Sequence, residues 1–131
     1  MTLVVSTLPG IYAICRLPAN ADVPLWPMQS AFFSITRTNH ELSIVCEEQH
    51  VRREEPGLRV EPGWRGLKLH GPIPFETTGV IASLTKPLAE AGISVSVIAT
   101  FDTDYLFVKK EVLDSAIAAL RSAGFEARDN G

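Results

Sequence analysis

The sequence has few cysteines, no excess of positive charge and no long apolar run, and each of these shortages excludes a class of protein. Cys15 and Cys46 are the two cysteines among 131 residues, and each lies inside an apolar run, outside any paired motif. They carry no zinc or redox signature, so we expect two buried free thiols. No apolar stretch approaches the ~20 residues of a membrane-spanning helix, and the N-terminus lacks the basic region of a secretory signal. We therefore expect a cytoplasmic protein without a membrane partner.

The charge balance argues against a nucleic-acid partner. The formal net charge is -3 and the isoelectric point is about 5.6, so there is no positive field to hold a phosphate backbone. Basic residues do gather between Arg52 and Lys68, but glutamates are interleaved with them. We interpret this segment as a solvated surface.

The sequence also lacks a catalytic constellation. His40, His50 and His70 are far apart, and none stands at a recognisable spacing from a serine, cysteine or carboxylate that could form a nucleophile and base pair. We therefore expect no catalytic residue, no metal centre and no cofactor. An enzyme is the hypothesis that the sequence supports least.

What is present is the composition of a globular protein. With 46% hydrophobic and 21% charged residues, the chain is long enough for one domain, or for two very small domains that share a core. From residue 66 onward, apolar spacing and turn residues predict six elements. They are a strand at Gly66–His70, a helix with Thr77 or Thr78 as its N-cap and Gly92 just past its end, strands at Ile93–Ala99 and Tyr105–Val108, a helix at Glu111–Ala123, and a strand at Phe125–Arg128. Pro87 lies inside the first of these helices, where we expect a kink or a break.

This order of elements, βαββαβ, predicts an α+β fold with a ferredoxin-like antiparallel sheet and both helices on one face. The N-terminal half repeats the pattern in reduced form. A shift of 63 positions sets Ser34–Val45 against Val97–Val108 and aligns a second hairpin. Ile11–Leu17 supplies a first strand, but Val23–Ser30, with two prolines, leaves room for a vestigial helix only. We predict a truncated unit with its connector at residues 1–63 and a complete unit at residues 64–131.

The sequence resembles the ACT domain family, specifically its group with two units, such as the ACT modules of aspartate kinase and of the cytosolic arginine sensor. Three segments carry the resemblance: TGVIA at Thr78–Ala82, LAEAGISVS at Leu88–Ser96, and TFDTDYLFV at Thr100–Val108. It covers Gly66–Arg128 well and Thr2–Glu48 more weakly, because the first helix is truncated there.

The resemblance implies a regulatory sensor domain that binds a free amino acid without chemistry. ACT modules pair, and the ligand sits at the junction between units, so the resemblance implies a homodimer and an allosteric role. Its site residues would come from the helix start and from the loop between the two hairpin strands. They are Glu76, Thr77, Thr78, Gly79, Val80, Thr100, Phe101, Asp102 and Asp104.

Elementary physics supports these positions but leaves alternatives open. Unpaired amide donors at a helix start near Gly79 can receive a carboxylate, although Gly79 can equally serve a tight turn. Asp102 and Asp104 share one face of an extended segment and, with Glu76, can hold an ammonium or guanidinium group. Asp102 alone can also close the hairpin turn through its own side chain. Magnesium at this pair of carboxylates would be weakly held, since no phosphate substrate is implied.

Two further hypotheses compete with an amino-acid sensor. One is an oligomerisation module that pairs through its sheet edges and binds no small molecule. The other is the enzyme considered above.

Overall fold

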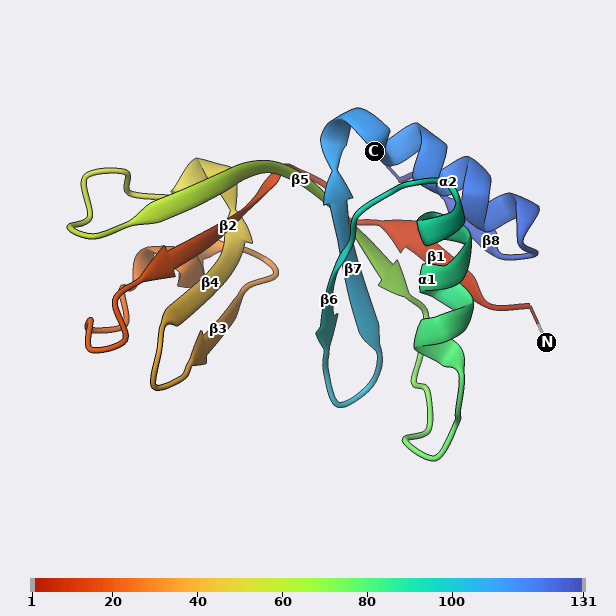
Figure 1. Ribbon diagram of the computed structural model, residues 1–131, viewed down its shortest axis with the longest axis horizontal. Helices are drawn as coiled ribbons and strands as arrows, with labels where there is room; N and C mark the ends of the chain where they lie inside the picture. The colour runs from red at the N-terminus through yellow and green to blue at the C-terminus, as the bar shows by residue number, and fades with distance from the viewer. Residues whose placement is uncertain (1, 131) are drawn as a thin grey trace. The chain divides into compact units, whose positions relative to one another are not determined.

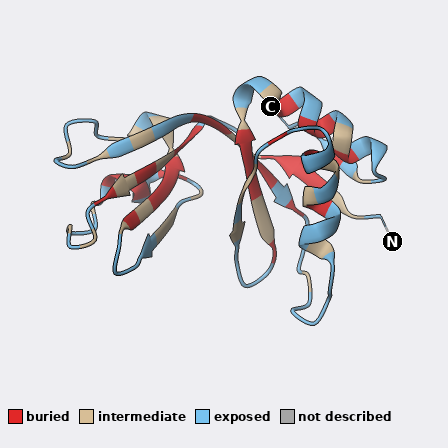
Figure 2. Cartoon of the chain, in the orientation of Figure 1, coloured by how far each residue is buried: buried red, intermediate tan, exposed pale blue. Residues whose placement is uncertain are grey.

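The computed structural model describes residues 2–130, which form two compact units (Figure 1). The first unit is Gly10–Trp64, and the second unit consists of the residues up to Pro9 together with those from Arg65 onward. Each unit has its own cluster of buried apolar side chains (Figure 2). The predicted division at residue 63 stays a prediction. The structure groups the residues up to Pro9 with the second unit, whereas the predicted division assigns them to the first.

The second unit is a five-stranded sheet with two helices. Its elements are β1 (Val4–Thr7), β5 (Arg59–Leu69, from Arg65 onward), α1 (Val80–Glu90), β6 (Ser96–Ala99), β7 (Asp104–Lys109), a 3-10 turn η3 (Lys110–Val112), α2 (Leu113–Ser122) and β8 (Glu126–Arg128). The strand order is β8-β1-β5-β7-β6. Buried leucines of both helices, such as Leu84 and Leu120, share one core with Leu69 and Leu106 of the sheet. The predicted α+β ferredoxin-like fold is confirmed.

Both helices end in the same hydrogen-bonded glycine motif. After α1, Gly92 has a φ of 74°, and the Ile93 amide donates to the Leu88 carbonyl over 2.9 Å. After α2, the Phe125 amide donates in the same way to the Leu120 carbonyl over 3.0 Å. These are Schellman-type ends, which need a residue free to adopt positive φ.

The interruption predicted at Pro87 does not break α1. The helix runs without a gap from Val80 to Glu90, with Pro87 inside it. Leu84 and Leu88, which stand on either side of the proline, are both fully buried. Their burial offsets the single backbone hydrogen bond to Ser83 that proline cannot donate.

The first unit, all of whose residues are described, has four strands and no α-helix. Its strands are β2 (Tyr12–Leu17), β3 (Ser34–Arg37), β4 (Leu42–Glu47) and the beginning of β5, in the order β3-β4-β2-β5. Two 3-10 turns, η1 (Trp26–Gln29) and η2 (Glu48–His50), stand where a complete unit has helices. The predicted vestigial helix is therefore η1, and its Trp26 packs into the core formed by Ala13, Cys15, Leu17 and their neighbours.

One strand serves both units. The first part of β5 pairs with β2 and its last part pairs with β1, so the end of the charged segment, from Arg59 to Trp64, is strand. The register with β2 slips between Tyr12 and Ile14, opposite Pro62 and Gly63, and Gly63 has a φ of 81°. Proline and glycine are tolerated inside this strand because a bulge removes them from regular pairing.

The strand at Val4–Thr7 was not predicted, and it alters the second sheet. β1 lies between β5 and β8, antiparallel to β5 and parallel to β8, so the sheet is not antiparallel throughout. Its sequence, VVST, shows no alternation of apolar and polar residues, which is why the pattern gave no strand signal. The buried Ser6 hydroxyl instead bonds His70, and the Thr7 hydroxyl bonds Asp129.

The two hairpins confirm an internal repeat but correct its spacing. In the first unit Arg37 pairs with Leu42, and in the second unit Ala99 pairs with Asp104, so each loop has four residues. Thr38 opens the first loop and Thr100 opens the second, which makes the shift 62 positions and not 63. The predicted alignment was one residue out because it matched apolar letters and not the loop threonines.

Candidate functional site

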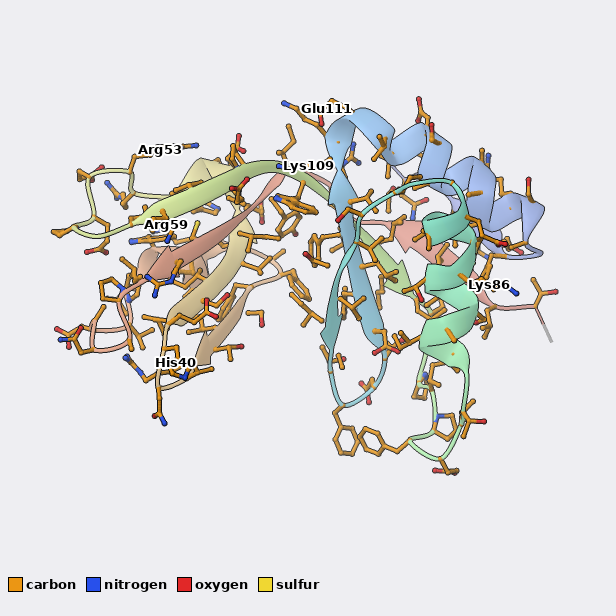
Figure 3. All side chains as sticks on the ribbon, viewed as in Figure 1. His40, Arg53, Arg59, Lys86, Lys109 and Glu111 are labelled. Carbon is orange, nitrogen blue, oxygen red and sulfur yellow. The ribbon has the colours of Figure 1, made fainter. Side chains whose placement is uncertain are left out.

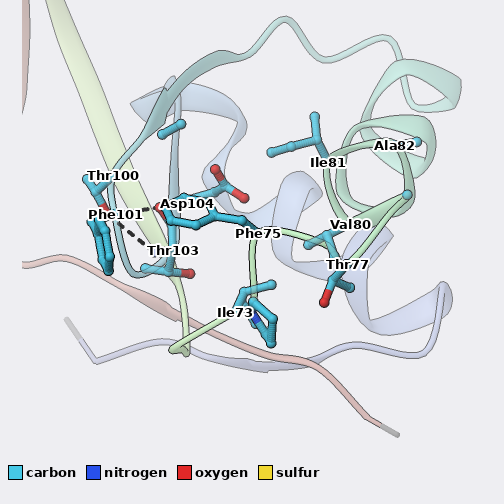
Figure 4. Close-up of a pocket in the computed structure, with 13 residues that line it drawn as sticks. Ile73, Phe75, Thr77, Val80, Ile81, Ala82, Thr100, Phe101, Thr103 and Asp104 are labelled. Carbon is cyan, nitrogen blue, oxygen red and sulfur yellow. Dashed lines mark hydrogen bonds between the residues drawn. The ribbon is translucent and has the colours of Figure 1, made fainter.

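The start of α1 and the β6–β7 loop border one pocket with a volume of about 350 Å³ (Figure 4). Thirteen residues line it, and all belong to the second unit. They are Ile73, Pro74, Phe75, Thr77, Gly79, Val80, Ile81, Ala82, Ala99, Thr100, Phe101, Thr103 and Asp104. The volume falls within the range of roughly 300–1,000 Å³ that is usual for small-molecule sites.

Backbone donors lie along one side of this pocket. Gly79 caps α1 with a φ of 77° and no side-chain cap, and the first hydrogen bond of the helix runs from the Ser83 amide to the Gly79 carbonyl. Within residues 2–130, the amides from Thr78 to Ala82 have no protein acceptor. An added Cβ at Gly79 would meet no atom within 4 Å, so the space in front of the cap is open. Such a helix start attracts an anionic group.

The β6–β7 loop on the other side is held in place by hydrogen bonds. The Thr100 amide and hydroxyl both donate to the Thr103 carbonyl, over 2.8 and 2.9 Å (Figure 4). The buried Thr103 hydroxyl donates to the Leu69 carbonyl over 2.7 Å, which ties the loop to the end of β5. The Ile73 amide donates to the Asp102 carbonyl over 2.7 Å and joins the two loops that border the pocket.

Gly71 makes this junction of loops sterically possible. A Cβ at Gly71 would approach the Asp102 carbonyl oxygen to 2.9 Å, closer than ordinary contact allows. The Gly71-Pro72 pair directly after the strand is the sequence signal of this junction.

Asp104 supplies the one carboxylate of the lining. It is the first residue of β7 and half-buried, and its side chain points toward the first turn of α1 (Figure 4). Its carboxylate has no hydrogen-bond or ion-pair partner within the described residues. The pocket therefore combines free backbone donors with one free anionic acceptor.

Six of the nine predicted site residues line this pocket. They are Thr77, Gly79, Val80, Thr100, Phe101 and Asp104. Glu76, Thr78 and Asp102 belong to the same loops but are exposed and do not line it. The predicted shared extended segment is not present, because Asp102 lies in the turn and Asp104 begins the strand. The binding role of all nine residues is still a prediction.

The remaining lining residues were missed by the sequence reasoning. Most are apolar: Ile73, Pro74, Phe75, Ile81, Ala82 and Ala99. Ile73, Pro74 and Phe75 form a compact apolar group between two turns, which could have marked them as a pocket wall. Thr103 is the polar residue among those missed, and its hydroxyl bonds the end of β5.

The two cysteines, which lie outside the pocket, are buried in the core of the first unit. Cys15 and Cys46 are buried and free, as predicted, and burial raises the pKa of Cys15 to about 11 and of Cys46 to about 12. Charged side chains such as Arg53, Arg59 and Lys86 are exposed (Figure 3).

Among residues 2–130, no group of three or more acidic, histidine or cysteine side chains is placed to hold a metal ion. None of the helices in that range has the length and apolar character to cross a membrane.

Two family models match successive parts of the chain. Residues 59–122 match the model described as ACT domain, and residues 10–54 match a model described as an N-terminal domain. The boundary between them falls close to the start of β5.

The chain is also similar to proteins of known sequence and structure. The cytosolic arginine sensor for mTORC1 subunit 1 of Bos taurus is 29% identical over 96 residues, which are 70% of this chain and 29% of that protein. The chain thus spans less than a third of that relative's length. A crystal structure of a protein from Agrobacterium tumefaciens is 37% identical, covers 100% of this chain and 96% of its own, and superposes with a TM-score of 0.91.

The regulatory subunit of aspartate kinase from Thermus thermophilus, solved without ligand, superposes with a TM-score of 0.67. It is 14% identical and covers 94% of this chain and 99% of its own. At that identity the likeness is one of fold.

Proposed function

Because this chain belongs to the ACT domain family, we propose that it is a regulatory domain that binds a free amino acid or a similar small zwitterion in the pocket at the start of α1. The observation that carries this proposal is the pairing of opposite charges across one cavity. Unbonded amides from Gly79 to Ala82 suit a carboxylate, and the Asp104 carboxylate suits an ammonium group. An α-amino acid carries both groups on one carbon.

The family comparisons support a regulatory role and no chemistry. The relative of Bos taurus is named as a sensor, and the Thermus thermophilus structure is named as a regulatory subunit. The lining of the pocket contains no pair of groups that could act as nucleophile and base, since its ionisable side chain is Asp104 alone. Location of the ligand at the junction of two units, as the resemblance implies, stays a prediction.

The proposal is tested by thermal unfolding with a panel of the twenty amino acids. At 100 times Kd, a ligand that binds only the native state adds about 2.7 kcal/mol to the free energy of unfolding. One or a few amino acids should therefore raise Tm by several degrees. Arginine, after which the relative of Bos taurus is named, is among those tested.

Asp104→Asn should remove that rise in Tm, because an amide cannot neutralise the ammonium group. Glu90→Gln is the matched control, since Glu90 is an exposed carboxylate at the other end of α1. A panel that leaves Tm unchanged throughout would contradict amino-acid binding.

A second candidate function is an interaction module that forms a homodimer. Edge strand β6 pairs with β7 alone among the described strands and leaves 41% of Val97 exposed. An open strand edge of this kind can pair with a second copy. Sedimentation at several concentrations tests it, and a monomer at all of them would argue against the homodimer.

A further inference from the structure

The charge and shape of the pocket at the start of α1 restrict the side chain that its ligand can carry. From them we infer that the amino acid bound there has a neutral, apolar side chain. The inference rests on the proposed function, because it specifies the ligand of the same site.

The charged side chains of the lining limit the charge that a ligand can carry. The lining contains one ionised side chain, that of Asp104, and no basic one. A zwitterion uses the free amides for its carboxylate and Asp104 for its ammonium group. A second positive charge on the ligand would then enter the pocket without an anionic partner, and unpaired charges in such a site are disfavoured.

The second step concerns the hydroxyl groups, which could otherwise serve a polar side chain. The Thr100 hydroxyl donates to the Thr103 carbonyl over 2.9 Å and accepts from the Thr103 amide over 3.3 Å. The Thr103 hydroxyl donates to the Leu69 carbonyl over 2.7 Å. Both hydroxyls are engaged in holding the β6–β7 loop, which leaves Thr77 as the lining hydroxyl free for a ligand.

The third step is the aromatic pair at the rim. Phe75 and Phe101 meet edge to face, with ring centroids 5.0 Å apart and an interplanar angle of 85°. They remain 72% and 80% exposed, although they belong to two different loops that converge on the pocket (Figure 4). An apolar ligand side chain between these rings, Ile73 and Ile81 would remove apolar surface from water on both partners.

Glu76 and Asp102 do not alter this count. Both lie in the loops that border the pocket, but both are exposed and neither lines it. Recognition of a cationic side chain would require one of them to turn inward. That alternative is an outcome of the test.

The test is titration calorimetry of the whole protein with leucine, phenylalanine, glycine, arginine and lysine. Leucine or phenylalanine should bind at least about 10-fold more tightly than glycine, because burial of a side chain of this size contributes on that order. Arginine and lysine should bind more weakly than the tighter of these two apolar amino acids.

Arginine or lysine as the tightest ligand would overturn the inference and leave the proposed function intact. No binding by any amino acid would overturn both. The two failures are therefore distinguishable within one experiment.

Phe101→Ala tests the aromatic contact directly. The variant should lower the affinity for the apolar ligand by about 10-fold, and Phe101→Leu should retain most of it, because an apolar surface remains. Phe101 is exposed, so circular dichroism should show both variants folded. Binding by Phe101→Ala as tight as that of the unmodified protein would overturn the inference.

Discussion

The two units share a hairpin whose four-residue loop begins with threonine, yet a helix start faces the hairpin loop in the second unit alone. In the first unit the Thr38 hydroxyl accepts from the Glu41 amide over 3.2 Å, as the Thr100 hydroxyl does from Thr103. The hairpin loop is therefore a shared framework. A ligand site also needs the free donors of a helix start, which the 3-10 turn η1 does not provide.

Equivalent positions, 62 residues apart, show that the first unit has different side chains where the second unit has its pocket. Leu42 is fully buried where the second unit has the half-buried Asp104. Arg37 stands where the second unit has Ala99, and its guanidinium donates to the carbonyls of Ala19 and Ala21. A core leucine and a bonded arginine thus replace two of the residues that line the pocket in the second unit.

The largest expected effect comes from weakening the packing of α1, a helix that the first unit lacks. Leu88→Ala leaves a cavity in the core that α1 shares with the sheet, and it should lower the free energy of unfolding by about 3 kcal/mol. Urea denaturation measures the change. Leu25→Ala, at a side chain that is 77% exposed, should change it by less than about 0.5 kcal/mol. A small effect of Leu88→Ala would mean that α1 adds little to the second unit.

A smaller effect is expected from the two loop threonines. Thr38→Val and Thr100→Val each remove one hydroxyl that bonds its own loop, and each should cost about 1 kcal/mol of stability. Only Thr100→Val should also weaken amino-acid binding, because its loop carries Phe101 and leads directly into Asp104. Calorimetry on the two variants provides the comparison, and equal loss of binding in both would contradict a site confined to the second unit.

The smallest effect at neutral pH concerns the thiols of the first unit. Burial raises the pKa of Cys15 to about 11 and of Cys46 to about 12, above the usual value of 9.0. Below pH 9 the thiols are protonated in both native and unfolded states, so they make no difference to stability. Between pH 9 and 11 the unfolded state releases protons that the native state retains, so stability falls as pH rises.

Thiol labelling at pH 8 checks this prediction, since it should proceed only in denaturant. A Cys15→Ala, Cys46→Ala variant should lose stability less steeply above pH 9 than the unmodified protein. Rapid labelling of the native protein would show that the thiols are accessible.

Much of the second unit could be predicted from the sequence, because its helices and strands carry regular spacing and end in glycine. Gly92 and Gly124 marked both helix ends, and the six predicted site residues that line the pocket follow from the helix start and the hairpin loop. The sequence could not reveal β1, whose pairing depends on partners about 60 and 120 residues away. Nor could it reveal which carboxylate lines the pocket, because that depends on where the turn ends and β7 begins.

The position of β1 has a consequence for how the protein is made. β1 leaves the ribosome before both of its partners, but it lies between β5 and β8 and cannot complete its pairing until residue 128 has been synthesised. At about 5–20 residues per second this leaves the nascent segment without partners for several seconds. The second unit must therefore finish folding after the first unit has emerged complete, and a nascent-chain experiment should show native structure at the first unit earlier.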